Sequence, residues 1–151
     1  MIVEYFKTRH NVKDPVRANP SDAGLDVFYC PTGNTEIIIE PGTNAILPTG
    51  LKFGVPHNHM LQVMNRSSMA AKSGLIVGAH CIDSGYDGEV FVDLHNIGTL
   101  PVVVSPNDKI AQLVMVPVLS FRAQEVGDDE LYQEPITISN RGNGALGSTG
   151  K

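Results

Sequence analysis

The fold class is decided by residues 89–118, EVFVDLHNIGTLPVVVSPNDKIAQLVMVPV. Three runs in this stretch, 89–96, 102–104 and 109–118, are rich in β-branched side chains, and glycine, proline and asparagine separate them. β-branched residues favour strands, and proline is tolerated between strands, where no ladder hydrogen bond needs its missing N–H. The stretch therefore predicts three consecutive β-strands.

The same pattern continues towards the N-terminus. Further strands are expected at 2–6, 26–29, 36–39, 44–47, 51–55 and 60–65. Only residues 68–73 have the character of a helix, which Ser67 or Ser68 could cap and Gly74 could end. Many short strands at this spacing predict an all-β, jelly-roll-like domain with one short helix.

Six apolar side chains in the predicted strands fit either the core or a contact between copies of the chain. They are Val90, Val92, Leu94, Val114, Val116 and Val118. Small β domains often cover their strand edges by associating with copies of themselves, so the sequence leaves both roles open.

Composition excludes several classes of function. The 151 residues are typical of one domain, expected at 1–130, with a C-terminal arm and flexible flap at 131–151. The net charge of −5 comes without a basic tract, so stable nucleic-acid binding is not expected. Cys30 and Cys81 show no CxxC spacing and no secretory leader precedes them, which favours a reducing, cytoplasmic location. No apolar run approaches the roughly 18 residues of a membrane span, so no membrane association is expected.

The last eleven residues, 141–151, contain four glycines, two hydroxyl side chains and two cations. Glycine loses more backbone entropy on ordering than other residues, so this segment needs a ligand to order it. A polyphosphate fits, because main-chain N–H groups together with Arg141, Ser148 and Thr149 can surround an anion. The tail predicts a flap that closes over a phosphorylated ligand; the alternative is a disordered polar tail.

A second candidate anion site is Arg66-Ser67-Ser68, at the end of an apolar strand and the start of the predicted helix. A guanidinium, two hydroxyls and the free N–H groups of a helix start match a diphosphate better than a neutral ligand. The alternative is a serine-capped helix beside a solvated arginine.

The segment 82–89, IDSGYDGE, places an acid and an aromatic ring in a glycine-containing turn. Asp83 is flanked by Ile82 and Cys81 and is expected to be partly enclosed. A carboxylate near a phosphorus could accept a proton from a water molecule and aim it in line with the leaving group. Tyr86 could pack against a sugar ring. The alternatives are an ordinary hairpin turn for Asp83 and a place in the sheet for Tyr86.

Two further segments carry polar side chains with a possible role in binding. Asp22 and Asp26 stand on either side of a glycine before a predicted strand, and they could order the water around a hydrated Mg²⁺ or simply form a turn. Gln112 lies inside the apolar run 109–118, so its amide needs a backbone or ligand partner.

Taken in order, five segments resemble the five motifs of the homotrimeric deoxyuridine triphosphate nucleotidohydrolase (dUTPase) family. The matching segments are AGLD at 23–26, RSSxAxKxGL at 66–75, GAxxIDxxYxG at 78–88, DxIAQL at 108–113 and RGxGxxGSTG at 141–150. The resemblance runs from Asp22 to Lys151. Each motif alone is weak, and their joint order and spacing carry the resemblance.

The resemblance implies a jelly-roll trimer of the dUTPase β-clip type, with three active sites that are each assembled from all three subunits. It implies hydrolysis of dUTP to dUMP and pyrophosphate, which limits uracil incorporation into DNA and supplies dUMP for dTMP synthesis. Asp83 would activate the attacking water at the α-phosphorus. Tyr86 would press against the deoxyribose and leave no room for a 2′-hydroxyl.

The other contacts with substrate are implied in the same way. The hairpin from 77 to 83 would read the uracil edge through its main chain, at Val77, Gly78, Ala79, His80 and Ile82. The phosphates would be held by Arg66, Ser67, Ser68 and Gln112.

The metal and the flap complete the implied site. Mg²⁺ would arrive on the triphosphate, and Asp26 would steady it through its water shell. The flap residues over the γ-phosphate would be Arg141, Gly147, Ser148 and Thr149. Leu146 stands where the family usually has Phe, so it would cover uracil without stacking on it and hold the base more weakly.

Two positions resemble the related dCTP deaminases, which share the fold. His80 follows Ala79, as it often does in those enzymes, and Asp93 falls at the position of their catalytic Glu, one methylene short. A dCTP deaminase, or a bifunctional deaminase and dUTPase, is therefore the first alternative. A further alternative is a regulatory protein without enzymatic function, in which the nucleotide gates contact with a partner.

Overall fold

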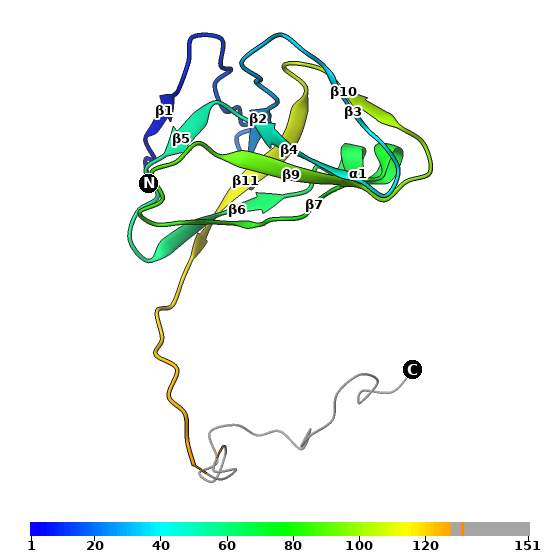
Figure 1. Cartoon of the computed structure of the whole chain (residues 1–151). Helices are drawn as coiled ribbons and strands as arrows, with labels where there is room; N and C mark the ends of the chain where they lie inside the picture. Colours follow the sequence, from blue (N-terminus) through cyan, green and yellow to red (C-terminus); the bar gives the residue numbers. More distant parts are fainter. Residues whose placement is uncertain (128–130, 132–151) are drawn as a thin grey trace. The chain divides into compact units, whose positions relative to one another are not determined.

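The structure, a computed structural model, describes residues 1–127 and residue 131 (Figure 1). The chain divides into two compact units, Met1–Ser120 and Phe121–Lys151. The strands and the helix described below belong to the first unit. The predicted flap at 141–151 lies outside the described residues, and the proposed division at residue 130 stays a prediction.

The first unit is built from eleven short strands and one helix in the part of the chain that the structure describes. The strands are β1 (Tyr5–Lys7), β2 (Leu25–Phe28), β3 (Ile37–Ile39), β4 (Asn44–Pro48), β5 (Leu51–Phe53), β6 (His59–Met64), β7 (Leu75–Val77), β8 (Cys81–Asp83), β9 (Phe91–Asn96), β10 (Val102–Val104) and β11 (Lys109–Pro117), and the helix is α1 (Ser67–Ser73). The prediction of an all-β domain with one short helix is confirmed.

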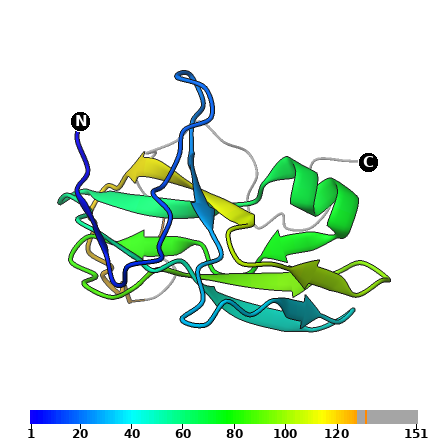
Figure 2. The same ribbon diagram turned by 90° about the horizontal axis from the view of Figure 1, so that it is seen from above.

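The strands form four sheets (Figure 1). The largest has the order β2-β11-β6-β8, and a three-stranded sheet has the order β4-β9-β7. The pairs β1-β5 and β10-β3 complete the fold, and all of these pairings are antiparallel. Figure 2 shows α1 at the same end of the fold as β3 and β10, and residues of α1 and β10 line a common pocket.

Burial assigns the six apolar side chains that the sequence left open. Val90, Val92 and Leu94 are at most 2% exposed and belong to the core. Val114 and Val116 are only half-buried, because they project from the opposite face of β11 to the core residues Ala111 and Leu113. Val118 follows the strand and is exposed. The large apolar core side chains with the least exposure are Ile39, Leu47, Leu51, Leu75, Val27, Val90, Val92, Leu94, Val104, Ile110 and Leu113.

The structure differs from the sequence prediction at several element boundaries. The first strand covers Tyr5–Lys7 rather than 2–6, because its pairing with β5 begins at Tyr5. The sequence missed β7 and β8 as strands, since each has only three residues and is held by its neighbour, β9 or β6. Tertiary pairing decides strands this short.

The helix was predicted correctly in position but wrongly in its cap. It begins at Ser67, and its N-cap is Arg66, with no capping hydrogen bond from a side chain. The Arg66 carbonyl accepts the first bonds, from the N–H groups of Met69 at 3.0 Å and Ala70 at 3.1 Å. Neither Ser67 nor Ser68 caps the helix, because both already lie inside it. Gly74 ends it with φ of 66°, as predicted.

Candidate active site

Three predicted site residues lie on one face of the four-stranded sheet. Asp26 is opposite Gln112 in the β2-β11 pairing. Gln112 is opposite Met64 in the β11-β6 pairing, and Asp83 is opposite Met60 at the other end of β6. Cross-strand partners share a face, and so do residues four apart along a strand. Asp26, Gln112 and Asp83 therefore project from the same side.

An ion cluster surrounds Asp26 at one end of this face. Its Oδ1 accepts a hydrogen bond from Arg66 Nε at 3.1 Å, and its Oδ2 lies 2.7 Å from Lys109 Nζ. Arg66 Nη1 also donates to the Lys109 carbonyl at 3.3 Å. The Asp26 side chain is only 14% exposed. One acid between two cations leaves a net positive charge, which suits an anionic ligand.

The Gln112 side chain lies beside this cluster, held by a hydrogen bond to the main chain and packed against Gly24. Its Nε2 donates to the Asn65 carbonyl at 2.9 Å, which is the backbone partner that the sequence required. A Cβ at Gly24 would come within 2.6 Å of Gln112 Oε1. Glycine at position 24 therefore leaves room for the amide to lie against the start of β2.

The two serines of the second motif follow Arg66 directly. Ser67 and Ser68 are both exposed, and the helix start does not use their hydroxyls as caps. The structure thus brings Asp26, Arg66 and Gln112 together, with the two serines next in sequence to the guanidinium. Lys109 completes the cluster. The sequence did not single it out, although its place inside the fourth motif segment, between Asp108 and Ile110, was a usable signal.

Asp83 lies at the end of β8, in a tight turn. The N–H of Tyr86 donates to the Asp83 carbonyl at 3.2 Å, and Gly85 has φ of 87°, which favours glycine at this place in a turn. Ser84 Oγ ties the turn to the Val55 carbonyl at 3.1 Å. Asp83 is exposed, so the prediction of a partly enclosed carboxylate is wrong for the described chain. Only Ile82 beside it is buried.

A pocket of about 200 Å³ opens beside Asp83 and Tyr86. Its other lining residues are Cys81, Ile82, Glu89, Val90 and Phe91. Tyr86 is 47% exposed, and its hydroxyl donates to the Glu89 carbonyl at 2.9 Å. The ring therefore stands at the wall of the pocket rather than in the core, and the alternative of a sheet-filling tyrosine does not describe it.

The predicted base-reading hairpin joins β7 to β8. The Val77 N–H donates to Asn65 Oδ1 at 2.6 Å, and the Gly78 N–H donates to the Asp93 carbonyl at 2.9 Å. His80 contacts β6, with Nδ1 3.0 Å from the Val63 carbonyl. The main-chain donors of Val77 and Gly78 are thus already in use. Donors for a base edge have to come from the part of the hairpin beyond Gly78.

Asp93 lies beside this hairpin, on the outer face of the three-stranded sheet. Its Oδ1 accepts from Asn44 Nδ2 at 2.8 Å, and its Oδ2 is 3.0 Å from His95 Nε2. Burial raises the pKa of Asp93, but the bonds from Asn44 and His95 outweigh it and hold that pKa below its usual range. A Cβ at Gly78 would come within 2.6 Å of Asp93 Oδ2, so glycine makes room for the carboxylate.

One chain does not bring all the predicted residues into a single site. Met60 and Met64 mark the positions of Asp83 and Gln112 along β6, and four residues of strand span about 13 Å. Between them the face carries the half-buried side chains of Gln62, Val114 and Val116. The acid and the cation cluster are therefore at opposite ends of the same face.

Among residues 1–127 and 131, no group of three or more His, Cys, Asp or Glu side chains could hold a metal ion by itself. Both Asp26 oxygens are engaged by cations, which fits a metal that is carried by a ligand and reaches Asp26 through water. Of the helices in the described part, none is long and apolar enough to cross a membrane.

Comparison with known sequences adds independent findings. A sequence model of the dUTPase family matches residues 10–150. The deoxyuridine 5'-triphosphate nucleotidohydrolase of Gloeobacter violaceus is 41% identical over 138 residues, covering 90% of this chain and 88% of that protein. The protein of the same name from Bordetella pertussis is 36% identical over 140 residues, covering 91% and 88%.

Solved structures show the same fold at lower sequence identity. A mutant Staphylococcus bacteriophage 80alpha dUTPase with dUpNHpp has a TM-score of 0.80 at 21% identity, covering 99% of each chain. A mutant dUTPase from phage phi11 of S. aureus, described with a structural Mg(II) ion, has a TM-score of 0.75 at 22% identity, covering 86% of this chain and 99% of that one. The predicted jelly-roll-like fold of the dUTPase β-clip type is confirmed. From motif order, family match and close relatives, the chain belongs to the dUTPase family.

Proposed function

We propose that the protein hydrolyses dUTP to dUMP and pyrophosphate, and so limits uracil incorporation into DNA and supplies dUMP for dTMP synthesis. The names of its curated relatives support this substrate. The observation that carries the proposal is the shared sheet face, with a cation cluster at one end and an exposed, turn-held acid at the other. The first end suits a triphosphate and the second suits water activation.

The triphosphate is bound at the cluster. Arg66 presents a planar guanidinium, and Ser67 and Ser68 offer hydroxyl donors beside it. Gln112, fixed to the Asn65 carbonyl, keeps its amide at the edge of the same site. Charge-assisted hydrogen bonds to phosphate are about twice as strong as neutral ones, so Arg66 contributes more to phosphate binding than the two serines or Gln112.

Mg²⁺ comes with the substrate and, when bound, offsets the negative charge that develops on the leaving pyrophosphate. Asp26 would hold the metal's water shell rather than the metal, since its two oxygens already contact Arg66 and Lys109. Lys109 holds Asp26 in place when Arg66 turns towards phosphate.

Asp83 performs the proton transfer. Its carboxylate accepts a proton from a water molecule whose oxygen attacks the α-phosphorus, and the bond from that phosphorus to the bridging oxygen of the β-phosphate breaks. The products are dUMP, with the water oxygen on its phosphate, and pyrophosphate. The tight turn at Gly85 and the bond from Ser84 Oγ hold Asp83 for this role.

Sugar, base and flap contacts set specificity and exclude water. Tyr86 packs against the deoxyribose, and the hairpin beyond Gly78 reads the base edge with main-chain groups. A donor facing a donor leaves buried groups unpaired, which disfavours cytosine strongly. The flap at 141–151 closes over the phosphates, with Arg141, Gly147, Ser148 and Thr149 on the γ-phosphate and Leu146 over uracil. Closure fixes the attack geometry.

The complete site is assembled from copies of the chain in a homotrimer. The separation of about 13 Å along β6 supports this, because the cation cluster and Asp83 of one chain cannot share one α-phosphate without a large change. The half-buried Val114 and Val116 between them offer an apolar contact for a neighbouring copy.

A deaminase is the second candidate, and one observation favours it: Asp93 lies against the base-reading hairpin at Gly78. Its carboxylate is, however, bonded at both oxygens, to Asn44 and His95. A general base needs one oxygen for water, so deamination requires that cluster to open. The regulatory alternative has no such support in the described residues.

The test supplies dUTP, dCTP, dTTP and UTP separately with Mg²⁺ and follows pyrophosphate and ammonia. Wild type should hydrolyse dUTP and release no ammonia from dCTP. Asp83→Asn should lower the dUTP rate by about 10²- to 10⁴-fold, the usual contribution of a general base. Asp87→Asn is the matched control, because the Asp87 side chain lies in the same loop and is 92% exposed. Turnover that survives Asp83→Asn contradicts the mechanism, and ammonia from dCTP supports the deaminase.

A further inference from the structure

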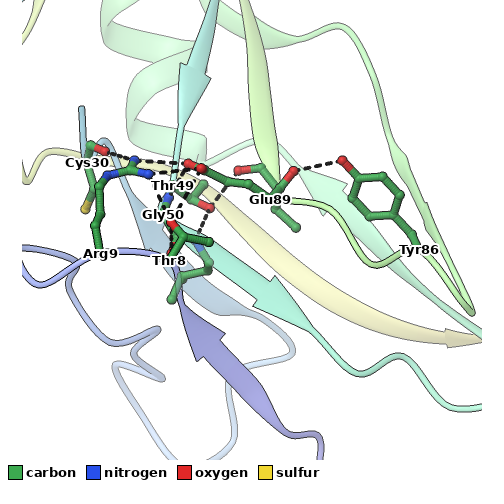
Figure 3. A network of polar contacts seen from close by, with 9 residues as sticks. Thr8, Arg9, Cys30, Thr49, Gly50, Tyr86 and Glu89 are labelled. Atoms are coloured by element: carbon green, nitrogen blue, oxygen red, sulfur yellow. Dashed lines mark hydrogen bonds and ion pairs between the residues drawn. The ribbon is translucent and has the colours of Figure 1, made fainter. Parts of the chain in front are cut away.

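A partly buried ion pair joins two segments that are 80 residues apart in the chain (Figure 3). Arg9 Nη1 lies 2.9 Å from Glu89 Oε2, and Arg9 Nη2 lies 3.0 Å from Glu89 Oε1. Arg9 also donates to the Cys30 carbonyl. The two side chains are 23% and 17% exposed. Two parallel bonds fix both the distance and the orientation of the carboxylate.

The main chain around Glu89 is fastened to the turn before β5. The Gly50 N–H donates to Glu89 Oε1 at 2.7 Å. The buried Thr49 hydroxyl donates to the Val90 carbonyl at 2.7 Å, and the Val90 N–H donates to the Leu51 carbonyl at 2.8 Å. Glu89 is therefore held through its side chain and through the next peptide.

The bonds from Arg9 and the Gly50 N–H to Glu89 form a clamp, and Tyr86 takes its position from this clamp. Its hydroxyl donates to the Glu89 carbonyl at 2.9 Å, as the dashed line in Figure 3 shows. A Cβ at Gly88 would overlap the phenol, so the ring lies back over the glycine towards Glu89. With 47% of the residue exposed, core packing does not fix the ring. The hydrogen bond from its hydroxyl to the Glu89 carbonyl fixes the ring instead.

We infer that Arg9 and Glu89 are positioning residues for Tyr86, and that their ion pair sets how closely the ring approaches the sugar of the substrate. This inference rests on the proposed function, in which Tyr86 excludes a 2′-hydroxyl. Glu89 lines the pocket beside Asp83, but its carboxylate is bonded to Arg9 and to the Gly50 N–H rather than to Asp83. Their effect falls on the discrimination between deoxyribose and ribose rather than on water activation.

The test compares kcat/KM for dUTP and UTP in Glu89→Gln, Arg9→Met and Tyr86→Phe. Each variant should lower the ratio of dUTP to UTP by about tenfold, the effect of losing one well-placed hydrogen bond. Lys7→Met is the matched control, because it removes one positive charge from the same segment and breaks only the exposed pair with Asp14. Its ratio should equal that of wild type.

A double variant separates positioning from simple stability. Tyr86→Phe combined with Glu89→Gln should discriminate no worse than either single variant, since both break the same link. Additive losses, or an unchanged ratio in folded Glu89→Gln and Arg9→Met, overturn the inference. NMR of labelled tyrosine gives a second readout: the Tyr86 Cζ signal, assigned with Tyr86→Phe, should move in Glu89→Gln and stay in Lys7→Met. Absence of dUTP turnover in wild type would count against the proposed function, whereas the Cζ signal tests the clamp independently.

Discussion

The two ends of the face formed by β2, β11, β6 and β8 are held by different means. At the Asp26 end, side chains hold one another: Asp26 contacts Arg66 and Lys109 directly, and Gln112 is tied to Asn65. At the Asp83 end, the carboxylate is exposed, and its loop is held from behind.

The difference indicates how far each end is organised before the substrate binds. The Asp26 cluster is complete before a ligand arrives, so phosphate binds to a pre-ordered set of charges. The Asp83 loop is held in place, but its carboxylate is exposed. Bulk water therefore competes for its hydrogen bonds. In the proposed function, a neighbouring copy and the flap enclose the carboxylate for the reaction.

The strongest test of this comparison mixes two inactive variants. Arg66→Met disrupts the Asp26 end and Asp83→Asn disrupts the Asp83 end, so each variant alone should be nearly inactive. If the site combines ends from different copies of a cyclic trimer, unfolding and refolding the two together at equal amounts should restore about a quarter of the wild-type sites.

Each variant refolded by itself is the control for that mixture. A mixture that stays as inactive as its components means that both ends act within one chain, and the separation along β6 then has to close by a conformational change. Size-exclusion chromatography with light scattering on wild type checks the trimer without reference to activity.

The clamp behind the Asp83 end can be broken through Gly50. This residue has φ of 73°, and a Cβ there would overlap the Val12 side chain. Gly50→Ala should lower the free energy of unfolding by about 3 kcal/mol, from left-handed strain and overpacking together. Gly42→Ala is the control, since Gly42 has φ of 75° but open space around it, and it should lose only about 1 kcal/mol. Equal losses in thermal melts at one protein concentration would contradict this account.

Much of the fold could be predicted from the sequence because local composition and strand pairing agree. The run at 102–104 became β10 without change, and the run at 109–118 became β11 with one residue less. Gly74 ended the helix as expected, since only glycine takes that conformation easily. The three-residue strands β7 and β8 escaped prediction, because their pairing partners rather than their composition define them.

The candidate site was predictable only where its residues lie inside short motifs. Asp83, Tyr86 and Arg66 carried local signals, and so did Gln112 as a polar residue in an apolar strand. The partnership of Arg9 with Glu89 carried none, because 80 residues separate them and either could have been a solvated surface charge. The exposure of Asp83 was missed because of the alternation along β8: Ile82 points to the opposite, buried face, and Cys81, on the same face as Asp83, is itself exposed.

Weakening the Asp26 end through Lys109 should have an intermediate effect. Lys109→Met removes the cation from Asp26 Oδ2 and leaves Arg66, on Oδ1, as the remaining cation beside Asp26, so Arg66 should be less available to phosphate. The KM for dUTP should rise about tenfold with kcat nearly constant, and the Mg²⁺ concentration for half-maximal rate should rise with it. Lys7→Met should leave both unchanged. A loss in kcat alone would place Lys109 in the chemical step instead.

The smallest expected effect is a pH dependence of stability from the Asp83 end. Burial raises the pKa of Glu89, but the bonds from Arg9 and the Gly50 N–H outweigh it and hold that pKa below its ordinary value of 4.5. A carboxyl group whose pKa is lowered on folding stabilises the fold above its ordinary pKa. That stabilisation is lost as the pH falls through the folded value.

Urea unfolding of wild type and Glu89→Gln between pH 7 and pH 3 measures this contribution. Wild type should be the more stable near pH 7, and the difference in the free energy of unfolding between the two proteins should narrow as the pH falls below about 4.5. Glu36→Gln, at an exposed carboxylate away from the clamp, should run parallel to wild type over the whole range. A gap between wild type and Glu89→Gln that stays constant with pH would mean that Glu89 stabilises the loop by shape and neutral hydrogen bonding alone.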